Sequence, residues 1–143
     1  MLLWRLTRAP YADLGGQGAQ LYGGRWNSPG APVVYGAAEP STSVLEVRVH
    51  LDVPLHLLPD DYVLVCVSLE EVAIEVGPAV GTRAECRTFG DQWLKQARTP
   101  LLRVPSAIVA ESTNLLLNPR HPDAPRASIV ASRTFQFDER VFG

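Results

Sequence analysis

Cysteine and histidine are scarce in this sequence. Its 143 residues include two cysteines, Cys66 and Cys86, and three histidines, His50, His56 and His121. Two cysteines are too few for a disulfide framework, and no cysteine–histidine pair has the spacing of zinc ligands. Cys66 lies within the apolar run YVLVCVSL, as is typical of a small buried hydrophobic residue. The composition therefore predicts neither a disulfide-stabilised scaffold nor a metal site.

Long apolar runs are also missing. No stretch approaches the ~18 apolar residues of a membrane-spanning helix. The first residues, MLLWRLTRAP, lack both the apolar run and the small-residue cleavage site of a signal peptide. Hydrophobic residues make up 46% of the chain and charged residues 20%, as in ordinary globular domains. We therefore expect a cytoplasmic protein without a membrane partner, folded as one domain over residues 1–143.

The chain has no excess of positive charge. Its formal net charge is −2 and its pI is about 5.9, which argues against direct binding of nucleic acid through phosphate contacts. Lysine is nearly absent, because only Lys95 among the 13 basic residues is a lysine. The arginines either bind anions through their forked guanidinium groups or reflect the composition of the genome.

Three common catalytic and nucleotide-binding motifs do not occur. The sequence has no Gly-Xaa-Ser-Xaa-Gly nucleophile elbow, no phosphate-binding loop and no dinucleotide fingerprint. Glycines are frequent between residues 15 and 24, but they do not form a strand–GxGxxG–helix unit. A nucleotide, if one binds, must therefore be held in another way.

Segments typical of strands outnumber those typical of helices and do not alternate regularly with them. This arrangement favours an α+β fold, with a mixed sheet and flanking helices, over a doubly wound parallel one. A loop is expected over the glycine- and proline-rich residues 11–32, and a short turn-like element in NLLLNPRHPDAP. The expected strands are Leu2–Thr7, Val33–Gly36, Tyr62–Leu69, Val72–Val76, a stretch around Pro105 in LLRVPSAIVAES, and one or two strands in Ala127–Asp138.

Two segments are predicted to be helical. The first lies between Pro40 and Pro54, with Ser41 or Thr42 as its cap and with Glu46 and His50 on one face. Its EVRVHL portion also alternates like a strand, and the helix is preferred because it closes between the two prolines. The second helix is Cys86–Arg98, although its Gly90 costs about 1 kcal/mol relative to alanine.

Four residues are candidates for chemistry, and each also has an ordinary structural interpretation. Arg25, in the loop YGGRWN, is either a solvated charge or an anion ligand, since its fork suits phosphate. Tyr35 is either packed at the edge of the core or a platform for a flat ring. Glu46 lies between apolar neighbours, where a carboxylate is seldom buried without a partner. Ser106, in VPSAIV, could be an unremarkable strand hydroxyl.

An ordered series of motifs changes this assessment. Four motifs follow one another along the chain, namely LYGGRWNSPGAPVVY, LEVRVH, LRVPSAIV and NLLLNPRHPD. This ordered series resembles the RES-domain family, and the resemblance covers nearly the whole chain. These are bacterial toxins of type II toxin–antitoxin pairs with an ADP-ribosyltransferase-like fold, so residues 1–143 would form a single RES domain. The resemblance implies that Arg25, Glu46 and Ser106 are the three residues of the family name, with Tyr35 as the active-site tyrosine. It also implies that Trp26 and Asn118, within the GGRWN and LNPRHP segments, contact NAD.

The resemblance further implies an activity that consumes NAD without a metal. Nicotinamide is cationic in NAD and leaves as a neutral molecule, so one carboxylate suffices to stabilise the oxocarbenium ion that remains on the ribose. Glu46 would have this role, Tyr35 would stack on nicotinamide, and Arg25 would hold the pyrophosphate. Ser106 would bond the nicotinamide ribose or its amide. Water, phosphate or a protein side chain could each trap the cation.

Partners follow from the same resemblance. An Xre-like antitoxin that blocks the active site is expected, together with a homodimer of the toxin within that complex. Two alternatives remain, a non-catalytic partner-binding domain and a ribonuclease-like toxin. The acidic pI and the lack of a histidine pair at the site count against the ribonuclease.

Overall fold

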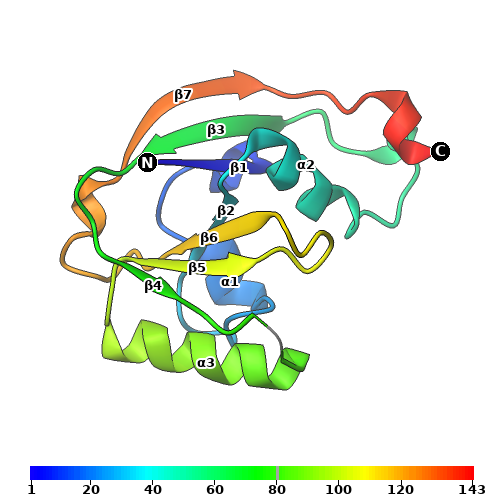
Figure 1. The fold of residues 1–143 in the computed structure, drawn as a ribbon. Coiled ribbons are helices and arrows are strands. Elements are labelled where there is room, and N and C mark those ends of the chain that lie inside the picture. The colour runs from blue at the N-terminus through cyan, green and yellow to red at the C-terminus, as the bar shows by residue number, and fades with distance from the viewer. Residues whose placement is uncertain (80) are drawn as a thin grey trace.

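The computed structural model describes residues 1–79 and 81–143, and its framework is one seven-stranded sheet. The strand order is β4-β5-β6-β2-β1-β3-β7, and every neighbouring pair is antiparallel except the parallel pair β4–β5. Chain segments from both ends therefore meet in one sheet (Figure 1). The strands are β1 (Leu2–Arg8), β2 (Val34–Ala37), β3 (Tyr62–Ser68), β4 (Ile74–Val76), β5 (Leu101–Pro105), β6 (Thr113–Leu117) and β7 (Ser128–Thr134).

Within the described residues three α-helices accompany the sheet, namely α1 (Gln17–Tyr22), α2 (Pro40–Arg48) and α3 (Arg83–Gln96). α3 is the longest and begins with a capping box, in which Thr82 Oγ1 accepts from Glu85 N and the Glu85 carboxylate accepts from Thr82 N. The 3₁₀ turns are Ala9–Tyr11, Leu55–Leu57, Ala124–Arg126 and Glu139–Phe142.

The sheet opens in its middle, between β1 and β2. β1 pairs with β3 along its whole length but registers with β2 only at Trp4 and Ala37. At this crossing Gly36 permits the backbones of β1 and β2 to approach closely, because a Cβ atom on residue 36 would lie 2.8 Å from the carbonyl oxygen of Trp4. β1, β3 and β7 therefore diverge from β2, β6, β5 and β4, as the upper and lower strands of Figure 1 show.

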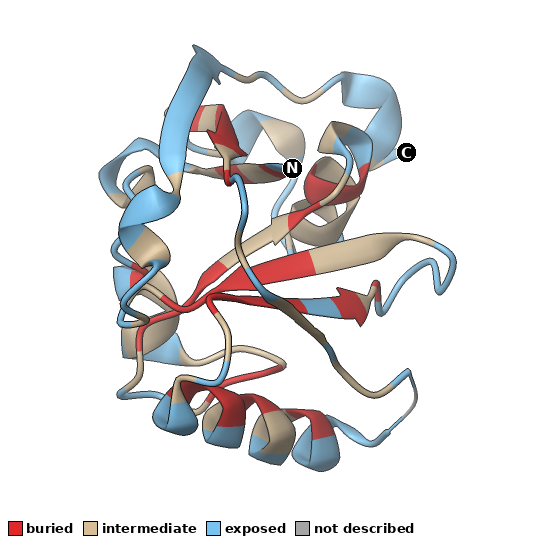
Figure 2. Ribbon diagram, turned by 60° about the vertical axis from the view of Figure 1, so that its left-hand side comes forward, coloured by how far each residue is buried: buried red, intermediate tan, exposed pale blue. Residues whose placement is uncertain are grey.

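Two helices pack on one face of this divided sheet. Val44 and Val47 of α2 pack with Leu6 and Leu64 of β1 and β3. α3 packs on the other group of strands, where its Trp93 and Leu94 meet buried side chains of β5 and β6 together with Trp26. The inner side of α3 is buried, whereas β7 is exposed along its length (Figure 2). α2 and α3 therefore stand over the two sides of the opening.

The predicted α+β class with a mixed sheet is confirmed, and β1 and β3 lie where the sequence pattern places them. α2 is shorter than expected, because it ends at Arg48 and leaves His50 in the turn that follows. The prediction that Glu46 and His50 share a helix face is therefore wrong. The prediction of a Ser41 or Thr42 cap is also wrong, since the N-cap is Glu39 without a side-chain bond and Pro40 starts the helix.

Two further expectations about local structure are wrong. Residues 113–117 are not turn-like but form β6, which has neighbours on both sides and buries Leu115, Leu116 and Leu117. A strand buried on both faces shows no alternation, so its apolar run carries no strand periodicity. The region 11–32, expected to be a loop, contains the helix α1. The strand expected around Pro105 is β5, which ends at that residue.

Among the residues described, no helix combines the length and apolar character needed to cross a membrane.

Candidate active site

A crevice of about 160 Å³ lies where β1 and β2 diverge beneath α2. Its polar lining comes from all three of these elements and from β6. The lining residues are Arg5, Leu6, Tyr35, Gly36, Ala37, Ser43, Glu46, Val47 and Asn114. The division of the sheet therefore brings together side chains that are far apart in the sequence.

The carboxylate of Glu46 is held at one oxygen only. Its Oε1 accepts hydrogen bonds from Ser106 Oγ at 2.5 Å and from Asn114 Nδ2 at 3.0 Å. Among the residues described, no protein donor reaches Oε2. Two bonds to one oxygen fix the orientation of the carboxylate and leave the other oxygen available to a ligand.

Ser106 is buried at the end of β5, where the chain turns away from the sheet. Its hydroxyl oxygen accepts from the backbone N–H groups of Ile108 at 3.1 Å and Val109 at 3.2 Å. These two bonds occupy the oxygen as an acceptor, so its proton is directed to Glu46. The structure therefore places Ser106 behind the carboxylate, as a residue that positions it.

Tyr35 joins the crevice to the loop that carries Arg25. Its hydroxyl donates to Asn27 Oδ1 at 2.7 Å and accepts from Trp26 N at 3.0 Å. Asn27 is fully buried, and its Nδ2 donates to three carbonyl oxygens of the surrounding loop, those of Ala19, Ser28 and Ala31. Burial raises the pKa of the Tyr35 phenol well above its usual range, so the phenol remains protonated and can keep donating.

Arg25 is half-buried in this loop, directly before Trp26. It lines neither the crevice nor the second cavity described below. In the described part of the chain, no hydrogen bond or ion pair joins the Arg25 guanidinium to another residue. The hydrogen bond from Trp26 N to the Tyr35 hydroxyl fixes the backbone directly after Arg25.

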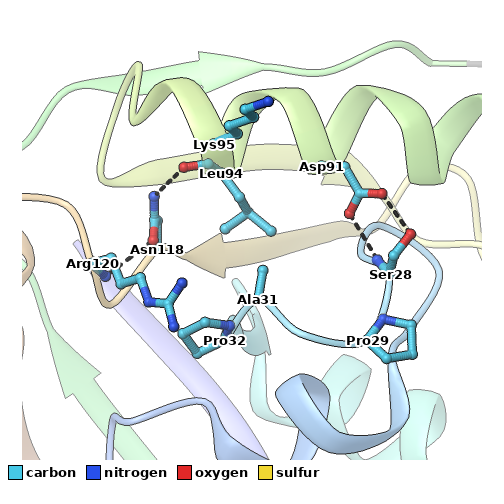
Figure 3. Close-up of a pocket in the computed structure, with 9 residues that line it drawn as sticks. All are labelled: Ser28, Pro29, Ala31, Pro32, Asp91, Leu94, Lys95, Asn118 and Arg120. Carbon is cyan, nitrogen blue, oxygen red and sulfur yellow. Dashed lines mark hydrogen bonds between the residues drawn. The ribbon is translucent and has the colours of Figure 1, made fainter.

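Trp26 and Asn118 lie apart from Glu46. Trp26 is buried against α3 and meets the ring of Phe89 edge-on, with 6.2 Å between the ring centroids. Asn118 lines a second cavity of about 330 Å³ between residues 28–32, α3 and the segment after β6 (Figure 3). Its amide donates to the Leu94 carbonyl and accepts from Arg120 N. Asn114 and Asn118 are separated by about 13 Å along the strand direction, so the two cavities lie at opposite ends of β6.

Arg5 is the site residue that sequence reasoning overlooked. It lines the crevice from β1, and its Nη1 donates to the Asp13 carbonyl at 2.9 Å. Its Nε is buried and has no hydrogen-bond partner among the residues that the structure describes. Burial lowers the pKa of the guanidinium, and the nearby Asp13 carboxylate partly offsets this. The available signal was a charged residue inside the short apolar strand LLWRLT, where solvation requires a specific partner.

Asn114 completes the set of polar groups at the crevice. Its Nδ2 donates to Glu46, whereas its Oδ1 is buried and accepts from no donor in residues 1–79 and 81–143. Glu46, Arg5 and Asn114 thus each keep hydrogen-bonding capacity that the described protein does not use. The two buried atoms among these, Arg5 Nε and Asn114 Oδ1, are costly to leave unsatisfied, and their occurrence at one crevice indicates a polar ligand. No group of three or more metal-ligating side chains occurs within residues 1–79 and 81–143.

Comparison with known proteins identifies the family of this chain. The family model of the RES domain matches residues 2–138. The chain is 38% identical to Toxin Res of Pseudomonas putida KT2440, over 99% of this chain and 100% of that protein. It is 40% identical to the Prs ADP-ribosylating toxin of Sphingobium sp. YBL2, over 90% of this chain and 86% of that protein. The chain belongs to the RES-domain toxin family.

The fold has a counterpart among solved structures. A chain of the crystal structure of the M. tuberculosis MbcT–MbcA toxin–antitoxin complex aligns with a TM-score of 0.75, covering 94% of this chain and 84% of that one. The sequence identity is 18%, so this likeness concerns the fold alone. The expected family and fold class are thereby both confirmed.

Proposed function

We propose that this protein is a toxin that cleaves NAD at the bond between nicotinamide and ribose. The observation that carries the proposal is the Glu46 carboxylate, which is fixed at one oxygen by Ser106 and Asn114 and open at the other. It lies in a crevice shared with Arg5 and Tyr35. The similarity to a protein named as an ADP-ribosylating toxin supports the same chemistry.

The reaction needs one carboxylate and no general acid. When the bond between ribose C1′ and the nicotinamide nitrogen breaks, its electron pair goes to the nitrogen and the pyridinium leaves as neutral nicotinamide. The positive charge remains on the ribose as an oxocarbenium ion. Glu46 stabilises this charge through its free oxygen, and the interaction strengthens as the charge develops. An acceptor oxygen then attacks C1′, and the final products depend on whether that oxygen belongs to water, phosphate or a protein side chain.

The crevice accommodates only part of the substrate. Its volume of about 160 Å³ is well below the ~300–1,000 Å³ of sites that enclose a drug-sized ligand. It holds the nicotinamide–ribose end, with the Tyr35 ring against nicotinamide and Arg5 beside the ribose. Arg25 meets the pyrophosphate outside it. Ser106 acts through Glu46 in this arrangement, and Trp26 and Asn118 stabilise the surrounding structure.

Release of nicotinamide by the purified protein tests this function. The expected result is that NAD is lost and an equal amount of nicotinamide is formed, both measured by chromatography. Mass spectrometry of the second product, with and without phosphate and with cell lysate, identifies the acceptor. Absence of NAD loss would indicate a partner-binding domain, and RNA cleavage without NAD loss would indicate a ribonuclease.

Replacement of Arg25 by lysine is expected to weaken NAD binding. Lysine keeps the charge but cannot offer two parallel N–H groups to a diphosphate. We expect the Kd for NAD to rise about 10-fold, with a smaller change in turnover at saturation, because charged hydrogen bonds contribute ~1.5–3 kcal/mol each. Calorimetric titration of Arg25→Lys measures this. An unchanged Kd would show that Arg25 does not hold the phosphates.

The partner we propose is an Xre-like antitoxin that closes the crevice, since an active enzyme would deplete the NAD of its own cell. It could present a carboxylate to Arg25 in place of phosphate. The likeness to a chain from a toxin–antitoxin complex is consistent with such a partner. Co-purification with the protein encoded beside this one, and loss of NAD turnover in the complex, are the expected results. A complex that turns over NAD as fast as the free toxin would contradict inhibition at this site. The mass of the complex, measured by light scattering, tests the proposed homodimer of the toxin.

A further inference from the structure

We propose that Arg87, assisted by Arg83, forms the second wall of a diphosphate-binding subsite opposite Arg25. This inference rests on the proposed function and extends it from the reacting end of the substrate to its phosphates. The ligand class is a nucleoside diphosphate. Its diphosphate would lie beyond the hydroxyl end of Tyr35, between the loop 24–27 and the N-terminal half of α3.

The packing of α3 on the loop places Arg87. A Cβ atom on Gly90 would lie 1.7 Å from the carbonyl oxygen of Trp26, so the helix backbone touches the loop there. One residue further, the Asp91 carboxylate accepts from Ser28 N at 2.7 Å and Ser28 Oγ at 2.6 Å (Figure 3). Arg87 precedes these residues by three and four positions and therefore shares their helix face, one turn nearer the N-terminus. This position lies alongside the loop residues before Trp26, where Arg25 stands.

The electrostatics of Tyr35 supports this placement. Burial is the main cause that raises the pKa of its phenol, and the Asp91 carboxylate acts in the same direction. The positive charges of Arg83 and Arg87 act in the opposite direction. Both guanidiniums therefore lie within electrostatic range of the Tyr35 hydroxyl, which itself bonds the backbone next to Arg25.

Neither arginine forms an ion pair in the described part of the chain. Two acids of the same helix bond other groups, because the Asp91 carboxylate accepts from Ser28 and the Glu85 carboxylate accepts from Thr82 N at the start of the helix. The Arg87 Nε is buried without a hydrogen-bond partner. A buried guanidinium donor without a partner is unfavourable, and a bound anion would satisfy it. Guanidinium forks match phosphate oxygens, and a diphosphate offers enough of them for more than one arginine.

Tyr35 connects this subsite to the reacting end. Tyr35 lines the crevice together with Glu46, and its hydroxyl bonds Trp26 N and Asn27 Oδ1 in the loop that carries Arg25. A dinucleotide can thus place nicotinamide in the crevice and its diphosphate against Arg25 and Arg87. The site should consequently favour NAD over nicotinamide mononucleotide, which has a single phosphate.

Titration with ADP tests the subsite without turnover. We expect Arg87→Gln to weaken ADP binding about 10-fold or more, the loss typical of one charged hydrogen-bonding group. Arg87→Lys should be intermediate, because it keeps the charge and loses the fork. The exposed Arg83 should contribute less. Arg133→Gln on the exposed strand β7 is the matched control and should bind ADP like the wild type.

The kinetic consequence separates this subsite from a merely structural role. Arg87→Gln should raise KM for NAD about 10-fold with little change in kcat, and should leave KM for nicotinamide mononucleotide nearly unchanged. Wild-type protein that fails to bind ADP, or Arg87→Gln and Arg87→Lys proteins that bind it normally, would overturn the inference. The two proposals can fail separately. If the wild-type protein binds ADP but releases no nicotinamide, and folded Arg87→Gln no longer binds ADP, the proposed function is refuted and the subsite is retained.

Discussion

Replacement of Glu46 by glutamine is expected to lower the turnover of NAD by about 10²-fold or more, the loss seen when one preorganised electrostatic group is removed. Glutamine has nearly the same size, and its carbonyl oxygen can still accept from Ser106 and Asn114. The change removes the negative charge that stabilises the oxocarbenium ion. Because that interaction matters mainly in the transition state, the affinity for NAD should change little. Single-turnover kinetics and calorimetric titration measure the two quantities separately.

The matched control is Glu39→Gln, which removes a carboxylate from the N-terminus of the same helix. Glu39 is exposed and makes no capping bond with its side chain. Its replacement should leave turnover unchanged and alter the free energy of unfolding by about 0.5 kcal/mol at most. A folded Glu46→Gln protein that still consumes NAD and arrests cell growth would exclude Glu46 as the catalytic carboxylate.

The second large effect is expected from Gly90→Ala in α3. In an exposed helix this change would stabilise the fold by about 1 kcal/mol. Here the new methyl group would lie 1.7 Å from the carbonyl oxygen of Trp26, so the helix and the loop must separate. Overpacking of this kind costs about 1–3 kcal/mol, and contact with backbone leaves little room for relaxation. We expect a net loss in the free energy of unfolding in urea, together with weaker NAD binding, because the loop carries Arg25.

Gly18→Ala in α1 is the control for this prediction. A Cβ atom there would meet only the Tyr11 ring, at an ordinary contact distance of 3.6 Å. Its effect should be neutral or stabilising by at most about 1 kcal/mol. If Gly90→Ala stabilised the protein as Gly18→Ala does, the close packing of α3 on the loop would be incorrect.

The features predicted correctly from the sequence are those that depend on local residue patterns. The apolar run YVLVCVSL forms β3, and the excess of strands over helices gives the α+β class. The ordered motifs identified the RES-domain family, which the match of the family model to residues 2–138 confirms. α3 begins at Arg83 because Thr82 and Glu85 form a capping box, a local signal that was present and overlooked.

Other features follow from contacts between distant segments, which no local pattern encodes. β6 is a central strand because β5 and β2 flank it, so its three leucines are buried and lose the alternation that would have marked them. Gly90, which disfavours a helix in isolation, is required by the loop that packs against it.

The polar surroundings of the carboxylate are the clearest tertiary outcome. The sequence by itself determined that Glu46, Arg25, Tyr35 and Ser106 are candidates, since their residue types suit the chemistry. Only the folded chain decided that Ser106 bonds Glu46 across 60 residues and that Asn114 bonds the same oxygen. It also decided that Arg5 enters the crevice, because β1 diverges from β2 beside that residue. The physical reason is that hydrogen bonds and charge pairs depend on distance in space, and the order of strands in the sheet sets that distance.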